Sequence, residues 1–196
     1  MIRPLRMGLL GCLVLIWGLG SAGMALAGYC SQERWDHASD AQRAFTADWK
    51  GEKADCDAHK ALFRKTKFTH QNLSFRELEA YMRHSPEESR DIFMDHAFRL
   101  EDQAVALRDT MVSLETVIDA GRAAAGEWYV LAGACHQRNP GNLERGKNNA
   151  AKVERHLTDA REAFIDMKLM YEVYCRERDL LQRWEKVLIE LKVEFP

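Results

Sequence analysis

The sequence predicts an all-α protein built on a long antiparallel coiled-coil helical hairpin, and three observations support this fold class. Apolar residues recur in alternating steps of four and three along two stretches, although charged residues make up 30% of the chain. The turn sequence Asn139-Pro140-Gly141-Asn142 separates the two stretches. No segment after residue 27 shows the strict alternation of polar and apolar residues that is typical of a β-strand.

Residues 1–27 are expected to form a secretory signal peptide. Arg3 and Arg6 precede an apolar run from Met7 to Gly20, and Ala25-Leu26-Ala27 supplies the small residues of a cleavage site. An uncleaved anchor is the alternative, since about 20 apolar residues can span a bilayer. We therefore expect a periplasmic or secreted protein that contacts a membrane only if this segment is retained.

The charge of the remaining chain argues against nucleic acid as a partner. Loss of Arg3 and Arg6 lowers Lys+Arg from 28 to 26 against 30 Asp+Glu, which gives a net charge of −4. Nucleic-acid binding depends on clustered Lys and Arg, and a mildly acidic domain lacks that excess. The 169 residues that remain of the 196 are expected to form a single folded domain, residues 28–196.

Residues 28–85 are predicted to form a clasp of short helices packed on the hairpin. The first helix should begin at the N-cap Ser31 and stop at Gly51, and a second should cover residues 52–65, followed by a loop at 69–72. The apolar residues of the first helix recur at helical spacing and are Trp35, Ala38, Ala41, Phe45 and Trp49.

Two further helix starts carry strong capping signals. Ser74 and Glu77 form a capping box, with Leu73 placed to staple onto Leu78. The segment Ser85-Pro86-Glu87-Glu88 repeats the pattern, because proline fits the first helical position and the second glutamate reaches back. A short helix is therefore expected over 75–84, and a long one from residue 86.

The hairpin, residues 86–196, carries the two apolar rows. The first row is Phe93, Ala97, Leu100, Ala104, Leu107, Met111, Leu114, Ile118, Gly121, Ala125, Trp128, Ala132 and Cys135; the second is Ala150, Val153, Leu157, Ala160, Phe164, Met167, Tyr171 and Tyr174. Antiparallel pairing places small residues opposite large ones, such as Ala132 opposite Val153, which fills a seam without voids. Gly121 and Gly126 are positions where the first helix could kink.

Four cysteines remain after the signal segment: Cys30, Cys56, Cys135 and Cys175. An even number in an exported chain predicts two disulfides. In a straight hairpin, Cys135 and Cys175 lie roughly 35 Å apart, so they cannot bond to each other. We expect Cys30 and Cys56 each to tie an N-terminal helix to the hairpin, in a pairing left open; a disulfide-bridged dimer is the alternative.

A second apolar stripe is one candidate interaction surface. Phe98, Val105 and Val112 repeat every seven residues on a face that the partner helix cannot reach, with Ile165 and Met170 as comparable material on the return helix. The favoured explanation is that the helix bearing Trp35, Phe45 and Trp49 covers the stripe. The functional alternative is that another subunit or a client polypeptide docks there.

A basic tip at the turn of the hairpin is the second candidate surface. Its five basic residues are Arg138, Arg145, Lys147, Lys152 and Arg155, which give residues 138–155 a net charge of +3. Residues 87–119 carry −6. Such a tip could meet an anionic surface or an acidic protein; ordinary solvated charges are the alternative.

No motif predicts an enzyme or a bound cofactor. The chain has no Gly-x-Ser-x-Gly elbow, phosphate loop or zinc-protease helix. Cys135-His136 lacks the first cysteine of a haem-attachment motif, and Cys56 with His59 lacks further ligands for a metal. We therefore expect a non-enzymatic binding or scaffold protein of the cell envelope (an adaptor, assembly subunit or chaperone-like protein) with protein partners and possible self-association. A metal- or haem-binding helical bundle is the alternative.

Overall fold

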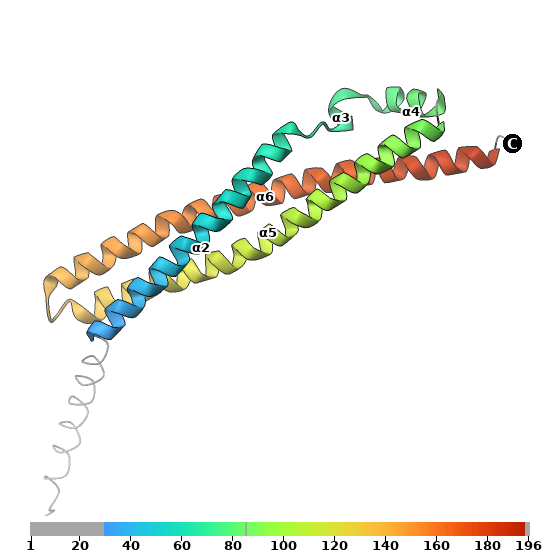
Figure 1. Ribbon diagram of the computed structural model, residues 1–196. Coiled ribbons are helices and arrows are strands. Elements are labelled where there is room, and N and C mark those ends of the chain that lie inside the picture. The colour runs from blue at the N-terminus through green and yellow to red at the C-terminus, as the bar shows by residue number, and fades with distance from the viewer. Residues whose placement is uncertain (1–29, 85, 195–196) are drawn as a thin grey trace, which may run out of the picture. The chain divides into compact units, whose positions relative to one another are not determined.

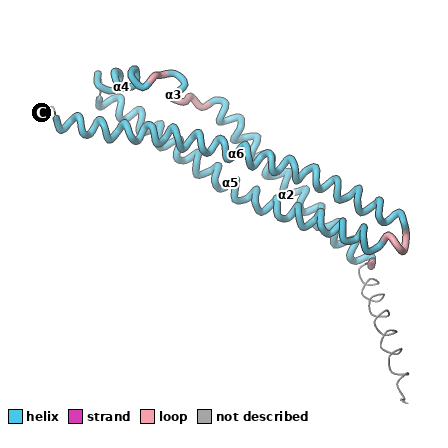
Figure 2. The backbone as a smooth tube through the Cα atoms, turned by 180° about the vertical axis from the view of Figure 1, so that it is seen from behind, coloured by secondary structure: helices cyan, strands magenta, loops and turns pink. Residues whose placement is uncertain are grey.

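The computed structural model describes residues 30–84 and 86–194, and within them every regular element is a helix (Figures 1 and 2). The helices are α2 (Gln32–Lys65), α3 (Thr69–Asn72), α4 (Phe75–His84), α5 (Pro86–Cys135) and α6 (Pro140–Glu194). The described part contains no strand, so the predicted all-α class is confirmed. None of the described helices is long and apolar enough to cross a membrane. The predicted signal peptide and the predicted cap Ser85 lie outside the described residues.

Side-chain caps fix several helix starts. Ser31 Oγ accepts a bond from the Arg34 backbone N–H at 3.4 Å. The capping box before α4 is confirmed: the Ser74 N–H donates to Glu77 Oε2 at 2.8 Å, and the Glu77 N–H donates to Ser74 Oγ at 3.3 Å. Hydrogen bonding of the Glu77 carboxylate to the side chain and the backbone N–H of Ser74 lowers the pKa of Glu77. Asn139 Oδ1 accepts the Gly141 N–H at 2.9 Å, which satisfies a free donor in the first turn of α6.

Three local predictions need correction. Gly51 does not end a helix, because α2 continues through it to Lys65. A mid-helix glycine costs about 1 kcal/mol relative to alanine, which the burial of Trp49 and Cys56 on either side can offset. The predicted loop at 69–72 is the single-turn helix α3. Leu78 is buried with Trp184, whereas its predicted staple partner Leu73 is exposed.

The chain divides into two compact units. Unit 1 comprises Met1–Thr46 and Ala120–His156, and unit 2 comprises Ala47–Asp119 and Leu157–Pro196. Helices α2, α5 and α6 therefore each contribute residues to both units. The predicted border between clasp and hairpin at residue 85 falls inside unit 2.

Unit 1 combines an aromatic contact with a close approach between helices. Trp35 on α2 and Trp128 on α5 have ring centroids 5.7 Å apart. Gly146 on α6 lies so near α5 that an added Cβ would be 2.7 Å from the Ala132 Cβ and 2.9 Å from the Trp128 carbonyl oxygen. His37 Nδ1 lies 2.9 Å from Glu127 Oε2, a further contact between α2 and α5.

Unit 2 has an aromatic cluster beside a buried carboxylate. The rings of Phe63, Phe68 and Tyr174 lie with centroids 5.2–5.6 Å apart. The Tyr174 hydroxyl and Thr66 Oγ1 are 3.2 Å apart. Glu177 is only 1% exposed, and its Oε1 accepts the backbone N–H of Thr69 at the start of α3.

The two apolar rows are largely buried, and further positions are buried beside them. The buried row positions are Ala97, Leu100, Ala104, Leu107, Leu114, Ile118, Gly121, Ala125, Trp128, Ala132 and Cys135 on α5, and Ala150, Val153, Leu157, Ala160, Met167 and Tyr174 on α6. Outside the rows, α5 also buries Val117, Ala124 and Leu131. This wider buried surface reflects a third helix, because α2 contacts α5 in each unit. Helix α5 runs unbroken through Gly121 and Gly126.

Candidate interaction surfaces

One disulfide joins the segment just before α2 to the end of α5. Cys30 bonds to Cys135, with Cα atoms 5.5 Å apart and a sequence separation of 105 residues. Both cysteines belong to unit 1. The bond agrees with the expectation that Cys30 is tied to a hairpin cysteine rather than to Cys56.

The second predicted disulfide is wrong, because Cys56 and Cys175 are free thiols. In unit 2, α2 and α6 run parallel: Lys60 Nζ contacts Asp166 Oδ2 at 2.6 Å, and the Thr66 and Tyr174 hydroxyls meet one turn or more further on. That register places Cys175 about 12 residues beyond the level of Cys56. At about 1.5 Å per residue the separation is roughly 18 Å, well beyond the reach of a disulfide.

The cysteines of the two candidate metal and haem motifs, Cys56 and Cys135, differ in their state. Cys56 is 1% exposed, and burial, together with the charge of Glu52, raises its pKa from 9.0 to about 11, so it remains a protonated thiol. His59 Nε2 lies 3.1 Å from Thr110 Oγ1. No group of three or more His, Cys, Asp or Glu side chains suited to a metal occurs among the described residues. Cys135 is consumed by its disulfide and is not free for haem attachment.

The basic tip lies in unit 1, and all five of its residues are exposed. The Arg145 guanidinium carbon is 4.8 Å from the centre of the Trp35 ring, a cation–π contact between α6 and α2. In the described part of the chain, none of the five forms an ion pair with an acidic side chain. The tip is therefore a surface with uncompensated positive charge.

The apolar stripe lies in unit 2 and is open to solvent. Phe98 is 64% exposed, Val105 38% and Val112 60%. The explanation that the tryptophan-bearing helix covers the stripe is therefore wrong. Trp35, Phe45 and Trp49 are buried elsewhere.

The contacts between α2 and α5 explain why the stripe stays open. In unit 2, α2 meets α5 at Ser113 and Thr110, which bond to Glu52 and His59. Successive helical residues point about 100° apart, so a face that presents Ser113 to α2 turns Val112 away from it. On α6 the comparable exposed residues are Ile165 and Leu169, each 56% exposed, whereas the predicted Met170 is buried.

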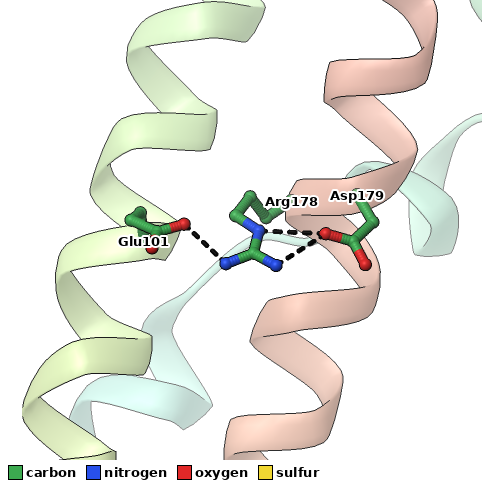
Figure 3. Close-up of polar contacts among 3 residues, drawn as sticks. All are labelled: Glu101, Arg178 and Asp179. Atoms are coloured by element: carbon green, nitrogen blue, oxygen red, sulfur yellow. Dashed lines mark hydrogen bonds and ion pairs between the residues drawn. The ribbon is translucent and has the colours of Figure 1, made fainter.

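A charged clamp beside the stripe was not predicted. Arg178 on α6 donates from Nη1 to Glu101 Oε2 on α5 at 2.6 Å, and from Nη2 and Nε to Asp179 Oδ1 at 2.7 and 3.0 Å (Figure 3). These carboxylates raise the pKa of Arg178 above its ordinary value. The sequence held a signal for this contact, because 178 is the next heptad step after Tyr174 and carries a charge where the row had none.

The described residues thus form an all-helical protein with one internal disulfide, a basic tip in unit 1 and an apolar stripe in unit 2. Comparison of the chain with models of protein families, with curated proteins and with solved structures found no match. A proposal of function therefore rests on the chain's own residues and contacts.

Proposed function

We propose that the chain is a non-enzymatic helical binding or scaffold protein that docks a protein partner on the apolar stripe. The observation that carries this proposal is the exposure of Phe98, Val105 and Val112 at seven-residue spacing. Residues seven apart lie on one helix face, roughly 10 Å from each other along the axis. A row of large apolar side chains left in water is a common mark of a protein-binding surface.

The stripe rests on a well-packed base, which favours binding. On the opposite side of α5, Leu100, Ala104 and Leu107 are at most 2% exposed. The clamp between Glu101 and Arg178 holds α5 to α6 beside the stripe. A surface that is already ordered loses less conformational entropy when a partner binds, so more of the contact energy appears as affinity.

We further propose that the protein works in the cell envelope, in the periplasm or outside the cell, as an adaptor, assembly subunit or chaperone-like component. Two observations support this location: the secretion-signal pattern of residues 1–27 and the Cys30–Cys135 disulfide, which is typical of oxidising compartments. Within the protein, α5 and α6 are proposed to pack along their apolar rows as an antiparallel coiled coil. The basic tip is proposed as a secondary contact for an acidic partner.

The proposal is tested by capturing partners from crosslinked cell envelopes with the full chain carrying a C-terminal tag. Val112→Asp disrupts the stripe, and Val130→Asp is its matched control, since Val130 lies on the same helix and is 52% exposed. We expect one stoichiometric protein to be captured by wild type and V130D, with at least tenfold less captured by V112D. Intact mass of the same sample checks removal of residues 1–27.

Two outcomes would contradict the proposal. Equal capture by V112D and wild type would show that the stripe is not the docking surface. A captured sample that lacks a protein partner but has extra mass or colour from a metal or haem would favour the alternative, a cofactor-binding bundle. Arg145→Glu combined with Lys147→Glu addresses the basic tip, and unchanged capture would leave its charges as ordinary solvated ones.

A further inference from the structure

We infer that the partner of the apolar stripe presents a basic amphipathic helix. This inference rests on the proposed function and adds the chemistry of the partner. On a helix, the neighbours of any residue on its own face lie three and four positions away. For the three stripe residues, five of the eight positions three and four residues away are acidic, and so are the positions one heptad beyond each end of the stripe.

The acidic rows can be read from the residue positions. One side of the stripe carries Asp95, Asp102 and Asp109; the other side carries Glu101, Arg108 and Glu115; and Asp91 and Asp119 stand one heptad beyond its two ends. Seven of these eight residues are acidic, and the two remaining neighbours of the stripe, Met94 and Thr116, are uncharged. A partner that covers the stripe must therefore place its own flanking residues against carboxylates.

Several of these carboxylates have no cation to compensate them. Asp95 pairs with Arg99 at 2.8 Å, and Glu101 is held by Arg178. In contrast, Asp91, Asp102 and Glu115 are exposed and form no ion pair with any described residue. The stripe is therefore an apolar row with a net negative surround, in which Asp91, Asp102 and Glu115 are the carboxylates without an ion pair to a described residue.

This negative charge distinguishes between two possible occupants of the stripe, a second copy of the chain and a helix of another protein. A second copy that paired stripe to stripe would bring the same acidic rows against each other, and like charges across an interface oppose association. The basic tip of a second copy offers the charge without an apolar row, because the exposed large apolar side chains near it, Tyr129 and Val130, are adjacent in sequence and do not repeat at seven-residue spacing. A separate helix with an apolar row flanked by Lys or Arg supplies both.

The test uses two labelled synthetic helical peptides of equal length that share one leucine row. One peptide has lysines beside the row and the other has glutamates, and each is titrated against the purified full chain by fluorescence anisotropy. We expect the lysine peptide to bind at least tenfold more tightly at low salt. The difference should shrink with added NaCl, because the screening length falls from about 10 Å at 0.1 M to about 3 Å at 1 M.

Three variants locate the binding. Val112→Asp should weaken the lysine peptide at least tenfold, whereas Val130→Asp should leave its affinity unchanged. Asp102→Asn with Glu115→Gln should weaken the lysine peptide severalfold while it slightly strengthens the glutamate peptide. All of these positions are exposed, and thermal unfolding of each variant confirms that the fold is retained.

The outcomes separate this inference from the proposed function. Binding of the glutamate peptide as tightly as the lysine peptide, with loss in V112D, would overturn the basic partner and leave the stripe as a docking site. A stripe-dependent dimer in sedimentation, abolished by V112D, would show that a second copy is the occupant and would also overturn it. Lysine-peptide binding that V112D does not change would overturn the assignment to the stripe, and unchanged envelope capture by V112D would then remove both proposals.

Discussion

The two units use the same three helices but stabilise them in different ways. Unit 1 has a covalent link, Cys30–Cys135, and a close helix approach at Gly146. Unit 2 lacks a disulfide in its described residues and relies instead on an aromatic cluster and the buried carboxylate of Glu177. The comparison teaches that one continuous set of helices can depend on covalent and steric constraints at one place and on polar contacts at another.

Their surface charges differ as well. Residues 30–46 and 120–156 contain eight Lys and Arg against six Asp and Glu, a net of +2, whereas residues 47–119 and 157–196 contain 18 against 24, a net of −6. The uncompensated cations of the basic tip and the uncompensated carboxylates around the stripe thus belong to different units. The two surfaces should therefore attract partners of opposite charge. Added salt should weaken the binding of both kinds of partner, because it screens both attractions.

The largest expected effect is the loss of the disulfide of unit 1. Cys30→Ser with Cys135→Ser reopens a loop of 105 residues in the unfolded chain, and the chain-entropy model assigns such a loop about 4–5 kcal/mol. We expect a clear fall in the midpoint of urea unfolding measured by circular dichroism. The control is Cys175→Ser, a free thiol, which should leave the midpoint nearly unchanged. Equal midpoints for the double variant and wild type would mean that the link contributes nothing.

The next largest effect should come from filling the close approach in unit 1. Gly146→Ala places a Cβ 2.7 Å from the Ala132 Cβ and against backbone at Trp128, so α6 must shift; overpacking of this kind costs about 1–3 kcal/mol. Gly126→Ala is the matched control, because nothing lies within 4 Å of its new Cβ. It should stabilise α5 by about 0.5–1 kcal/mol. If both substitutions raise the midpoint of thermal unfolding, the claim that Gly146 has no room for a Cβ is wrong.

Gly146 also shows what the sequence could have revealed. It lies four residues before Ala150 and so continues the second apolar row by one heptad step, but a glycine carries no apolar signal. The rows, the capping box at Ser74 and the all-α class were predictable because they depend on local spacing. A close backbone approach depends on the partner helix, and only the structure places it.

The position of α2 was not predictable for a related reason. Helix α5 carries two additional stripes of seven-residue spacing: the large residues Phe98, Val105 and Val112, and the smaller set Val117, Ala124 and Leu131. Helix α5 buries the smaller set and exposes the larger. The two sets occupy different stretches of α5, so the spacing along this helix does not say which of them α2 covers. The missing Cys56–Cys175 bond has the same origin, because spacing along one helix does not fix the register of α2 on α6.

In unit 2 the polar contact at Glu177 can be broken without removing a covalent link. Glu177→Leu leaves the part-buried Thr69 N–H, at the start of α3, without its side-chain acceptor, and we expect a loss of about 1 kcal/mol, the low end of the cost of an unsatisfied buried donor. Glu177→Gln keeps an acceptor oxygen and should cost less. Glu172→Leu, at an exposed position of the same helix, is the control and should change the urea midpoint little. A larger loss in E172L than in E177L would contradict the role of this contact.

The smallest effect concerns the buried thiol of unit 2 and appears only at alkaline pH. Burial raises the pKa of Cys56 from 9.0 to about 11 in the folded protein. As the pH rises through 9, the unfolded chain loses this proton while the folded chain keeps it, so the unfolded state binds fewer protons and the free energy of unfolding falls. We expect this contribution to decline between about pH 9 and 11 and to be fully present below pH 9.

Comparison with Cys56→Ala isolates that contribution from the other groups that titrate in the same range. The stability advantage of wild type over C56A, measured by urea unfolding, should be smaller at pH 10 than at pH 8, since C56A has no thiol to ionise at this site. Alkylation gives an independent check: at pH 8 the native protein should react with iodoacetamide at Cys175 before Cys56, because the thiolate is the reactive form and Cys56 is both protonated and 1% exposed. Rapid labelling of Cys56 in the native protein would show that its site in unit 2 opens readily. In that case the stability difference between wild type and C56A should be the same at pH 8 and pH 10.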